Sequence, residues 1–258
     1  MTRIVRRYAR IVRRSVYTVL GMDLAARREV ALPVLWLGSE YGSFGVWGEP
    51  LGPDSVVYSA GVGEDISFDI ELIAAYGVQV EAFDPTPHSV AWVEEQELST
   101  AFRFTPVGVA GADGDAKFFL PENPEVEMSA AIGGHATTGK ETAWLPVRRI
   151  GTLMAERGHT YIDVLKMDIE GAEYDVIEDV LASELDIGQV LVEVHHFLGT
   201  MSERRALTER TRRLRSQMYA AGYRLFAVSD LGHDYSFVHT DLLTRHRSRG
   251  RRVSARRV

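Results

Sequence analysis

Short apolar runs alternate with helical stretches along most of the chain from residue 52 onward. Apolar runs bounded by glycine, proline or polar turn residues are typical of buried strands, and apolar positions that recur every three to four residues are typical of helices. The predicted strands are 55–60, 78–83, 102–109, 116–120, 144–147, 161–167, 189–195, 223–229 and 235–240. The predicted helices are 65–76, 85–98, 150–157, 173–186 and 202–221.

Repetition of strand, helix and strand predicts right-handed crossovers and a largely parallel sheet with helices on both faces. The last two predicted strands are joined by only about five residues, which is too short for a crossover, so one of them must run antiparallel. We therefore predict an α/β fold with a doubly wound, mostly parallel sheet and one antiparallel strand near the end of the chain. The pattern shows no internal repeat.

The first residues follow a different pattern. Eight apolar positions share one helical face, and arginines take the other. These positions are Ile4, Val5, Tyr8, Ile11, Val12, Val16, Val19 and Leu20. We expect a helix that packs on the domain or on a second subunit of a homodimer; the alternative is a helix at a membrane surface. The arginines interrupt every run that could serve as a secretory signal.

Charge divides the chain into three parts. Residues 1–28 and 245–258 each carry a net charge of +7, and the residues between them carry −21. The C-terminal stretch lacks apolar periodicity, so we expect a disordered tail. The predicted organisation is a basic helix and linker at 1–36, one domain at 37–244 and a tail at 245–258.

The sequence contains no cysteine. This excludes disulfides, Cys-ligated zinc, iron–sulfur clusters and thiol nucleophiles. It fits a reducing environment, so we expect a cytoplasmic protein, with a peripheral position at the membrane as the alternative.

A glycine turn follows the first predicted strand of the domain. Gly61 and Gly63 allow a ligand close to the backbone, but Ile66 stands where a dinucleotide fingerprint needs its third glycine. Asp84 ends the next strand about 20 residues later, where an acid can bind both hydroxyls of a ribose. The alternatives are a plain tight turn and a helix cap at Asp84. A ribose site without a strong phosphate site favours a nucleoside cofactor, of which S-adenosylmethionine is the common one.

Four blocks then follow in order: VVYSAGVGEDISFD, VEAFDPTPHSVAWV, IDVLKMDIEGAEYDVIEDVL and QVLVEVHHF. With YGSFGVW upstream and GYRLFAVSDLGHDYSFV downstream, they resemble FkbM-type S-adenosylmethionine-dependent methyltransferases. The resemblance runs from about Leu37 to Thr240, and KMDIEGAEY is its most specific block.

This resemblance implies a Rossmann-like class I methyltransferase fold, with a seven-stranded sheet whose last strand is antiparallel. It implies O-methylation, often of sugar hydroxyls in glycans or natural products. Ser59 stands where many relatives place Asp. The resemblance and the ends of the predicted strands together give the expected cofactor-binding residues. These are Tyr41, Ser59, Gly61, Gly63, Asp84, Thr86, Val109, Ala110 and Asp168.

Three side chains are the expected catalytic group. Asp168 follows a buried strand, and Glu193 and His195 share one face of the next strand because side chains alternate. His195 would act as general base with a carboxylate orienting it, or all three residues would hold Mg or Mn that acidifies a hydroxyl. The structural alternative is a salt-linked edge network of Lys166, Asp168 and Glu170, with a packed His196. Glu173 is expected to be structural, at a helix N-terminus.

The acceptor is expected to be a small molecule or glycan with a hydroxyl group. Nucleic acid is disfavoured, because the body is acidic, no Asn/Asp-Pro-Pro-aromatic turn follows the fourth buried strand, and no cysteine nucleophile exists. The long loop 121–143, with His135, would line the acceptor pocket. The competing functions are a non-catalytic nucleoside-binding module and, disfavoured by Ile66, a nicotinamide-dependent oxidoreductase.

Overall fold

A computed structural model describes residues 17–21, 23–39, 42–119, 131–132, 142–196 and 200–255, with side chains through residue 248. Residues 1–16 of the expected N-terminal helix lie outside the described residues, as do Tyr41 and His135. Within the described part, no helix has the length and apolar character needed to cross a bilayer.

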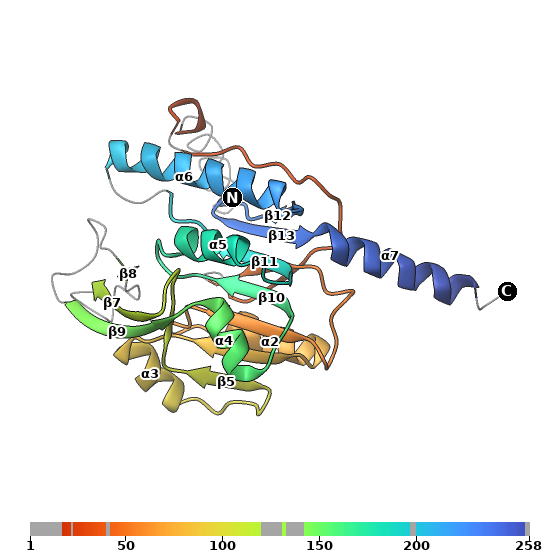
Figure 1. The fold of residues 1–258 in the computed structure, drawn as a ribbon, viewed down its shortest axis with the longest axis horizontal. Helices are drawn as coiled ribbons and strands as arrows, with labels where there is room; N and C mark the ends of the chain where they lie inside the picture. The colour runs from red at the N-terminus through yellow and green to blue at the C-terminus, as the bar shows by residue number, and fades with distance from the viewer. Residues whose placement is uncertain are drawn as a thin grey trace, which may run out of the picture.

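The centre of the fold is a seven-stranded sheet with the order β12-β13-β11-β10-β3-β4-β5 (Figure 1). Strands β11, β10, β3, β4 and β5 pair in parallel, and β13 pairs antiparallel with both β11 and β12. This arrangement confirms the predicted α/β class and the antiparallel last strand. The bounds are β3 Val56–Ala60, β4 Gln79–Phe83, β5 Phe102–Thr105, β10 Ile162–Met167, β11 Ile187–Glu193, β12 Tyr223–Val228 and β13 Asp234–His239.

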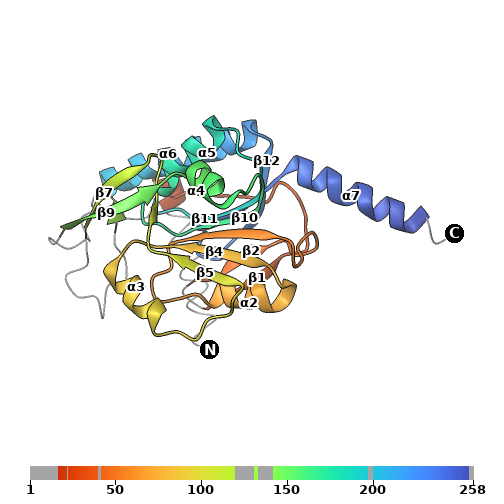
Figure 2. The same ribbon diagram turned by 60° about the horizontal axis from the view of Figure 1, so that its bottom comes forward.

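Helices cover both faces of this sheet (Figure 2). One core lies between the sheet and α4, α5 and α6, and the other lies on the face covered by α2 and α3. Buried side chains such as Tyr58 and Leu153 fill the first core, and Val57 and Leu72 fill the second. The bounds are α2 Ser67–Tyr76, α3 Pro87–Glu94, α4 Ile150–Arg157, α5 Glu173–Ala182, α6 Met201–Ala220 and α7 Thr240–Ala255.

A second, smaller sheet of four strands lies beside the carboxyl edge of the first, with the order β6-β9-β7-β8. Its strands are β6 Gly108–Val109, β7 Gly114–Phe119, β8 Ala131–Ile132 and β9 Thr142–Arg148. The single strand predicted at 102–109 is therefore wrong, because β5 ends at Thr105 and β6 pairs with β9 instead. Pro106 has no amide hydrogen, so it cannot continue the ladder between the two segments.

The C-terminal residues also differ from the prediction. The expected disordered tail at 245–258 is helical through Ala255, and α7 extends away from the body (Figures 1 and 2). Leu243 is buried at its start, and the His246 ring lies 4.9 Å from that of Trp47. Arginine is a good helix former, so a helix that is started by packing can continue through an arginine-rich sequence.

Residues 23–37, here called the N-terminal strap, run along the edge of the sheet. The amide of Glu29 donates to the carbonyl of Leu225 at 2.7 Å, and the Glu29 carboxylate accepts from the Leu225 amide at 2.9 Å. The last three residues of the strap form β1 (Leu35–Leu37), which pairs antiparallel with β2 (Phe44–Val46). Edge strand β12 is therefore covered by the protein's own chain.

Candidate functional site

A cavity of about 290 Å³ opens at the carboxyl edge of the parallel strands. Its wall contains the glycine turn after β3, the end of β4, the start of the small sheet and the end of β10. Ligands bind at this position in open α/β sheets. Seven of the predicted site residues line the cavity: Gly61, Gly63, Asp84, Thr86, Val109, Asp168 and Glu193. Tyr41 lies outside the described residues.

Backbone bonds bring three strand ends together at the glycine turn. The Gly61 amide donates to the carbonyl of Phe83 at 3.0 Å, and the Asp168 amide donates to the carbonyl of Ala60 at 3.0 Å. Gly61 has φ +82°, and a Cβ there would lie 1.7 Å from the Asp168 carbonyl oxygen. A side chain at this position would force β3 and β10 apart, so the turn requires glycine.

Asp84 holds the glycine turn in place. Its Oδ2 accepts from the amides of Val62 and Gly63 at 3.0 and 3.1 Å, and its Oδ1 accepts from the Thr86 amide and hydroxyl at 2.9 and 2.7 Å. The N-cap of α3 is Thr86, which accepts from the Ser89 amide, so the helix-cap alternative for Asp84 is wrong. Asp84 is buried and still lines the cavity.

Two predicted cofactor residues are not brought to the cavity. Ser59 is fully buried, lies beside Asp69 of α2, and is not among the described residues that line the cavity. Successive strand residues alternate between faces, so Ser59 points beneath α2. Ala110 lies one residue beyond the lining residue Val109, and its amide donates to the Arg148 carbonyl at 3.0 Å.

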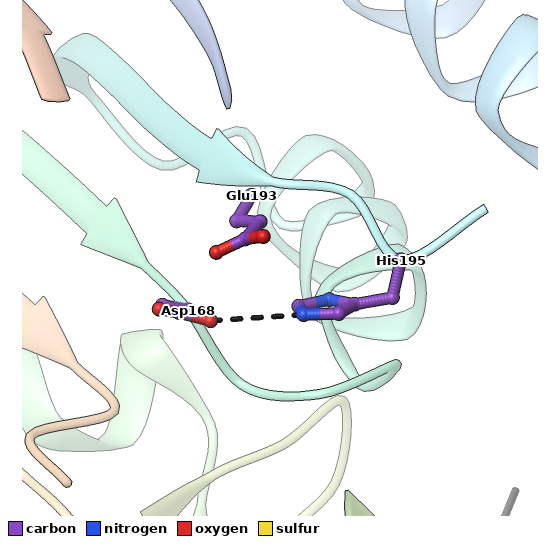
Figure 3. A group of neighbouring side chains, drawn as sticks. All are labelled: Asp168, Glu193 and His195. Atoms are coloured by element: carbon purple, nitrogen blue, oxygen red, sulfur yellow. Dashed lines mark ion pairs between the residues drawn. The ribbon is translucent and has the colours of Figure 1, made fainter. Parts of the chain in front are cut away.

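The expected catalytic side chains do meet. Each of Asp168, Glu193 and His195 offers a ligand atom, and these atoms lie within 4.8 Å of one another. Figure 3 shows the ion pair between Asp168 and His195, with the Glu193 carboxyl group in the same space. The predicted strand to residue 195 is too long, because β11 ends at Glu193 and His195 follows in the turn. The three residues meet because neighbouring parallel strands end together.

Three carboxylates surround His195. Its Nδ1 lies 3.3 Å from Glu173 Oε1, and its Nε2 lies 3.2 Å from Glu170 Oε2 and 3.8 Å from Asp168 Oδ1. Burial alone would lower the pKa of His195, but these negative charges, with Glu173 the strongest, outweigh burial and raise that pKa well above its ordinary value. The ring therefore carries a proton at neutral pH.

Glu173 has a more specific role than the expected one at a helix N-terminus. It is fully buried, and its carboxylate also accepts from the backbone amides of His195 at 3.1 Å and Gly171 at 2.6 Å. Burial opposes its ionisation, but the charge and hydrogen bonds of His195 outweigh burial and lower the pKa of Glu173. Glu173 thus connects the turn after β10 with the turn after β11.

Two further carboxyl groups at this edge, those of Glu193 and Asp234, hold protons more tightly than usual. Burial, with the charge of Asp168 added, raises the pKa of Glu193 to about 9. Burial also raises the pKa of Asp234 to about 6. Negative groups are therefore crowded at this edge, and a cation placed among them would stabilise their charged forms.

A second histidine is fixed by the strap. His196 is fully buried, and its Nε2 lies 3.2 Å from Oδ1 of buried Asp23. This pair joins the strap to the turn that carries His195. Sequence patterns gave no signal for this pairing, because the partners are 173 positions apart. His196 is packed, as the structural alternative expects.

Comparison with known proteins decides the family. Residues 56–225 match the model of the methyltransferase FkbM domain. This chain belongs to the FkbM methyltransferase family. The matched residues include the glycine turn, Asp84 and the Asp168 edge.

Curated relatives of this FkbM chain include the probable methyltransferase-like protein 24 of Homo sapiens, which is 31% identical over 147 residues, covering 55% of this chain and 33% of the human protein. The protein of the same name from Rattus norvegicus is 26% identical over 147 residues, covering 55% of this chain and 34% of the rat protein. The match therefore spans about a third of the length of these relatives.

Solved structures similar to the FkbM chain include the Methanococcus jannaschii fibrillarin pre-rRNA processing protein, with a TM-score of 0.40 and 10% identity over 76% of this chain and 70% of that chain. A geranyl diphosphate methyltransferase in complex with GPP and sinefungin gives a TM-score of 0.38 and 10% identity over 74% of this chain and 72% of that chain.

Proposed function

We propose that this protein is an S-adenosylmethionine-dependent methyltransferase that methylates a hydroxyl group of a sugar, glycan or other small molecule. One observation carries the proposal. A single cavity combines the glycine turn and Asp84, suited to a nucleoside, with the acidic edge at Asp168, suited to an acceptor. The FkbM family membership supports methyl transfer as the reaction.

The cofactor would lie across the glycine turn. Its ribose hydroxyls would bind Asp84, which is one of the residues that line the cavity. Phe83, Val109 and Phe118 supply apolar wall on the side of the cavity near the small sheet, where a planar base would pack. The sulfonium would then lie toward Asp168. When bound, S-adenosylmethionine supplies an activated methyl group.

The chain's own residues would orient and deprotonate the acceptor. In the transfer, the acceptor oxygen forms a bond to the methyl carbon, the carbon–sulfur bond breaks and leaves a neutral thioether, and the hydroxyl proton goes to a base. Asp168 lines the cavity and is our choice for that base. Protonated His195, fixed by Glu173, would stabilise the Asp168 carboxylate through the 3.8 Å ion pair.

The metal-assisted alternative remains a second proposal. Asp168, Glu193 and His195 offer two carboxylates and one imidazole, a donor set that suits Mg or Mn. His195 would have to lose its proton and its contact with Glu170 to bind the ion. Full turnover in excess EDTA would exclude this alternative, and loss restored by Mg or Mn would support it.

The charge of the cavity narrows the acceptor. Of the described residues that line it, six are acids, and Lys166 is the one lysine or arginine. A phosphate-bearing acceptor would be repelled at this edge, whereas an uncharged sugar hydroxyl would not. We therefore propose an uncharged or cationic acceptor and do not expect nucleic acid. The acids are Glu64, Asp65, Asp84, Asp168, Glu170 and Glu193.

Calorimetry and a turnover assay test the proposal. The protein should bind S-adenosylmethionine and S-adenosylhomocysteine and should not bind NAD. Incubation with S-adenosylmethionine and a panel of uncharged glycosides should release S-adenosylhomocysteine. Binding of NAD alone would favour an oxidoreductase. Cofactor binding with no turnover on any hydroxyl, amine or phosphorylated acceptor would favour the non-catalytic module.

A further inference from the structure

Two side chains of opposite charge line the cavity beside the glycine turn, and neither takes part in the ribose or acceptor chemistry described above. They are Asp65, at the start of the segment that leads into α2, and Lys166, on β10. Ser59, the residue expected to contact the cofactor here, points away beneath α2. This part of the cavity therefore presents a fixed negative group and a fixed positive group.

Asp65 is held as an ionised carboxylate. Its Oδ2 accepts from the Ser39 hydroxyl at 2.5 Å, and its Oδ1 accepts from the Ser67 amide at 2.8 Å. Burial alone would raise the pKa of Asp65, but these hydrogen bonds outweigh burial and hold that pKa below its ordinary value. The carboxylate is thus preorganised, with remaining acceptor positions on both oxygens.

Lys166 brings its ammonium group to the same place. The side chain is 4% exposed, and its Nζ donates to the Gly61 carbonyl at 2.7 Å and lies 5.5 Å from the centre of the Phe44 ring. An ammonium has three donors, and the Gly61 carbonyl takes one of them. Taking a lysine out of water is costly unless it meets acceptors, so its place in the wall of a ligand cavity fits a ligand that supplies one.

We infer that Asp65 and Lys166 together recognise the zwitterionic amino-acid end of the cofactor, with Asp65 binding its ammonium group and Lys166 its carboxylate. This inference rests on the proposed use of S-adenosylmethionine. Gly42 lines the same region, and a Cβ there would lie 3.0 Å from Asp65 Oδ2, so glycine leaves the carboxylate accessible. Lys166 contacts the glycine turn at the Gly61 carbonyl, whereas Asp84 contacts it at the amides of Val62 and Gly63.

Two probes separate this recognition from the rest of cofactor binding. S-adenosylhomocysteine carries the amino-acid end, and 5′-deoxy-5′-methylthioadenosine lacks it but keeps the nucleoside. In Asp65→Asn and in Lys166→Gln, affinity for S-adenosylhomocysteine should fall about tenfold or more, since each loses a charge-assisted contact. Affinity for the methylthioadenosine should stay within about twofold. Calorimetry measures both.

Asp69→Asn is the matched control. Asp69 is an acid of the same helical region, is buried near Lys166, and is not among the described residues that line the cavity. This variant should bind both probes about as well as wild type. Equal losses for both probes in Asp65→Asn, or unchanged binding of both, would overturn the inference. If the wild type binds neither probe, the proposed cofactor itself is wrong.

A wild-type measurement covers the case in which a variant does not fold. Decarboxylated S-adenosylhomocysteine keeps the ammonium group and loses the carboxylate that Lys166 would bind. The wild-type protein should bind it about tenfold or more weakly than S-adenosylhomocysteine. Equal affinity for the two would overturn the role given to Lys166.

Discussion

Asp168 is the residue to which the proposed mechanism gives the central role. It directly follows β10 in the most specific block of the sequence, lines the cavity and forms an ion pair with His195. The structure changes which of Asp168, Glu193 and His195 we propose as the base. Glu173 and Glu170 raise the pKa of His195, which favours an electrostatic role for this ring, so in the proposed mechanism a carboxylate accepts the proton.

Asp168→Asn should abolish turnover, because the amide keeps the shape but loses the negative charge needed to accept a proton or to hold a metal firmly. Affinity for S-adenosylhomocysteine should remain within a few-fold of wild type, since the loss falls on the transition state. The measurements are S-adenosylhomocysteine release with an accepted hydroxyl compound and calorimetry. Asp175→Asn, an exposed acid on α5, is the matched control and should retain turnover. Wild-type turnover in Asp168→Asn would remove the residue from the mechanism.

Asp84→Ala should weaken S-adenosylmethionine binding at least tenfold. The substitution would remove the proposed hydrogen bonds to the ribose, each worth about 1.5–3 kcal/mol for a charged acceptor. It also leaves the amides of Val62 and Gly63 without their acceptor, so the glycine turn loosens. Calorimetry on this variant and on Asp54→Ala, an exposed control, measures the effect. Unchanged affinity with a lower melting temperature would mean that Asp84 only holds the turn.

Asp69 makes stability depend on pH. Burial raises its pKa to about 6 from an ordinary value of 3.8. The folded protein therefore binds this proton more tightly than the unfolded chain does. The resulting stability is fully present below the pKa of the unfolded chain and is lost as pH rises through about 6. Asp69→Asn has no proton to lose at this position. The difference in free energy of unfolding between this variant and wild type should therefore shift in favour of the variant by on the order of 2–3 kcal/mol from about pH 4 to pH 7. Urea denaturation at both pH values checks this, and a constant difference would contradict it.

At the scale of elements, the order of strands and helices was predictable, and so was the glycine turn. Periodicity places α4 at 150–157, its observed bounds, because local packing and local sequence agree there. The break at Pro106 was missed because the apolar run on either side reads as one strand. Alternation brought Glu193 and His195 to one face, although His195 lies beyond the strand.

What could not be predicted depends on contacts between distant segments. No local pattern pairs Asp23 with His196 or brings Asp65 near Lys166, since these residues approach one another only when the whole sheet has formed. Ser59 was assigned to the cofactor by family position, but its direction is set by the pleat of β3. The direction of a side chain at a strand end changes with a single residue of register.

Deleting residues 1–20 tests the N-terminal element. Of these residues, Tyr17 packs under Arg204, whose Cζ lies 5.7 Å from the centre of the Tyr17 ring. The Leu20 carbonyl accepts a hydrogen bond from Arg205 Nε at 3.3 Å. The deletion should lower the melting temperature or convert a dimer to a monomer, as measured by calorimetry and light scattering. Deleting 249–258 removes a similar number of arginines and is the charge control. Tight binding to anionic vesicles, lost only on deletion of 1–20, would show a membrane helix instead.

At the scale of the whole molecule, charge is separated along the chain but not fully in space. The basic helix α7 begins on the acidic body, where His246 lies 3.2 Å from Glu49 and Arg245 lies 3.7 Å from Asp186. The family match at 56–225 covers the glycine turn, Asp84 and Asp168. It leaves out the strap, β1, β2, β13 and α7. The folded unit is therefore larger than the conserved domain model.

The position of β13 has a consequence for how the protein is made. β13 lies between β11 and β12, yet of the strands in the described part of the chain it is the last to be synthesised. From the synthesis of β11 until that of β13, β11, a run of buried residues, therefore has an open sheet edge with unpaired amides and carbonyls. Domains form from the N-terminus onward during translation, and exposed edges of this kind promote aggregation. A nascent chain that stalls before residue 239 carries the segments that line the cavity on a sheet in which β11 and β12 are not yet joined by β13.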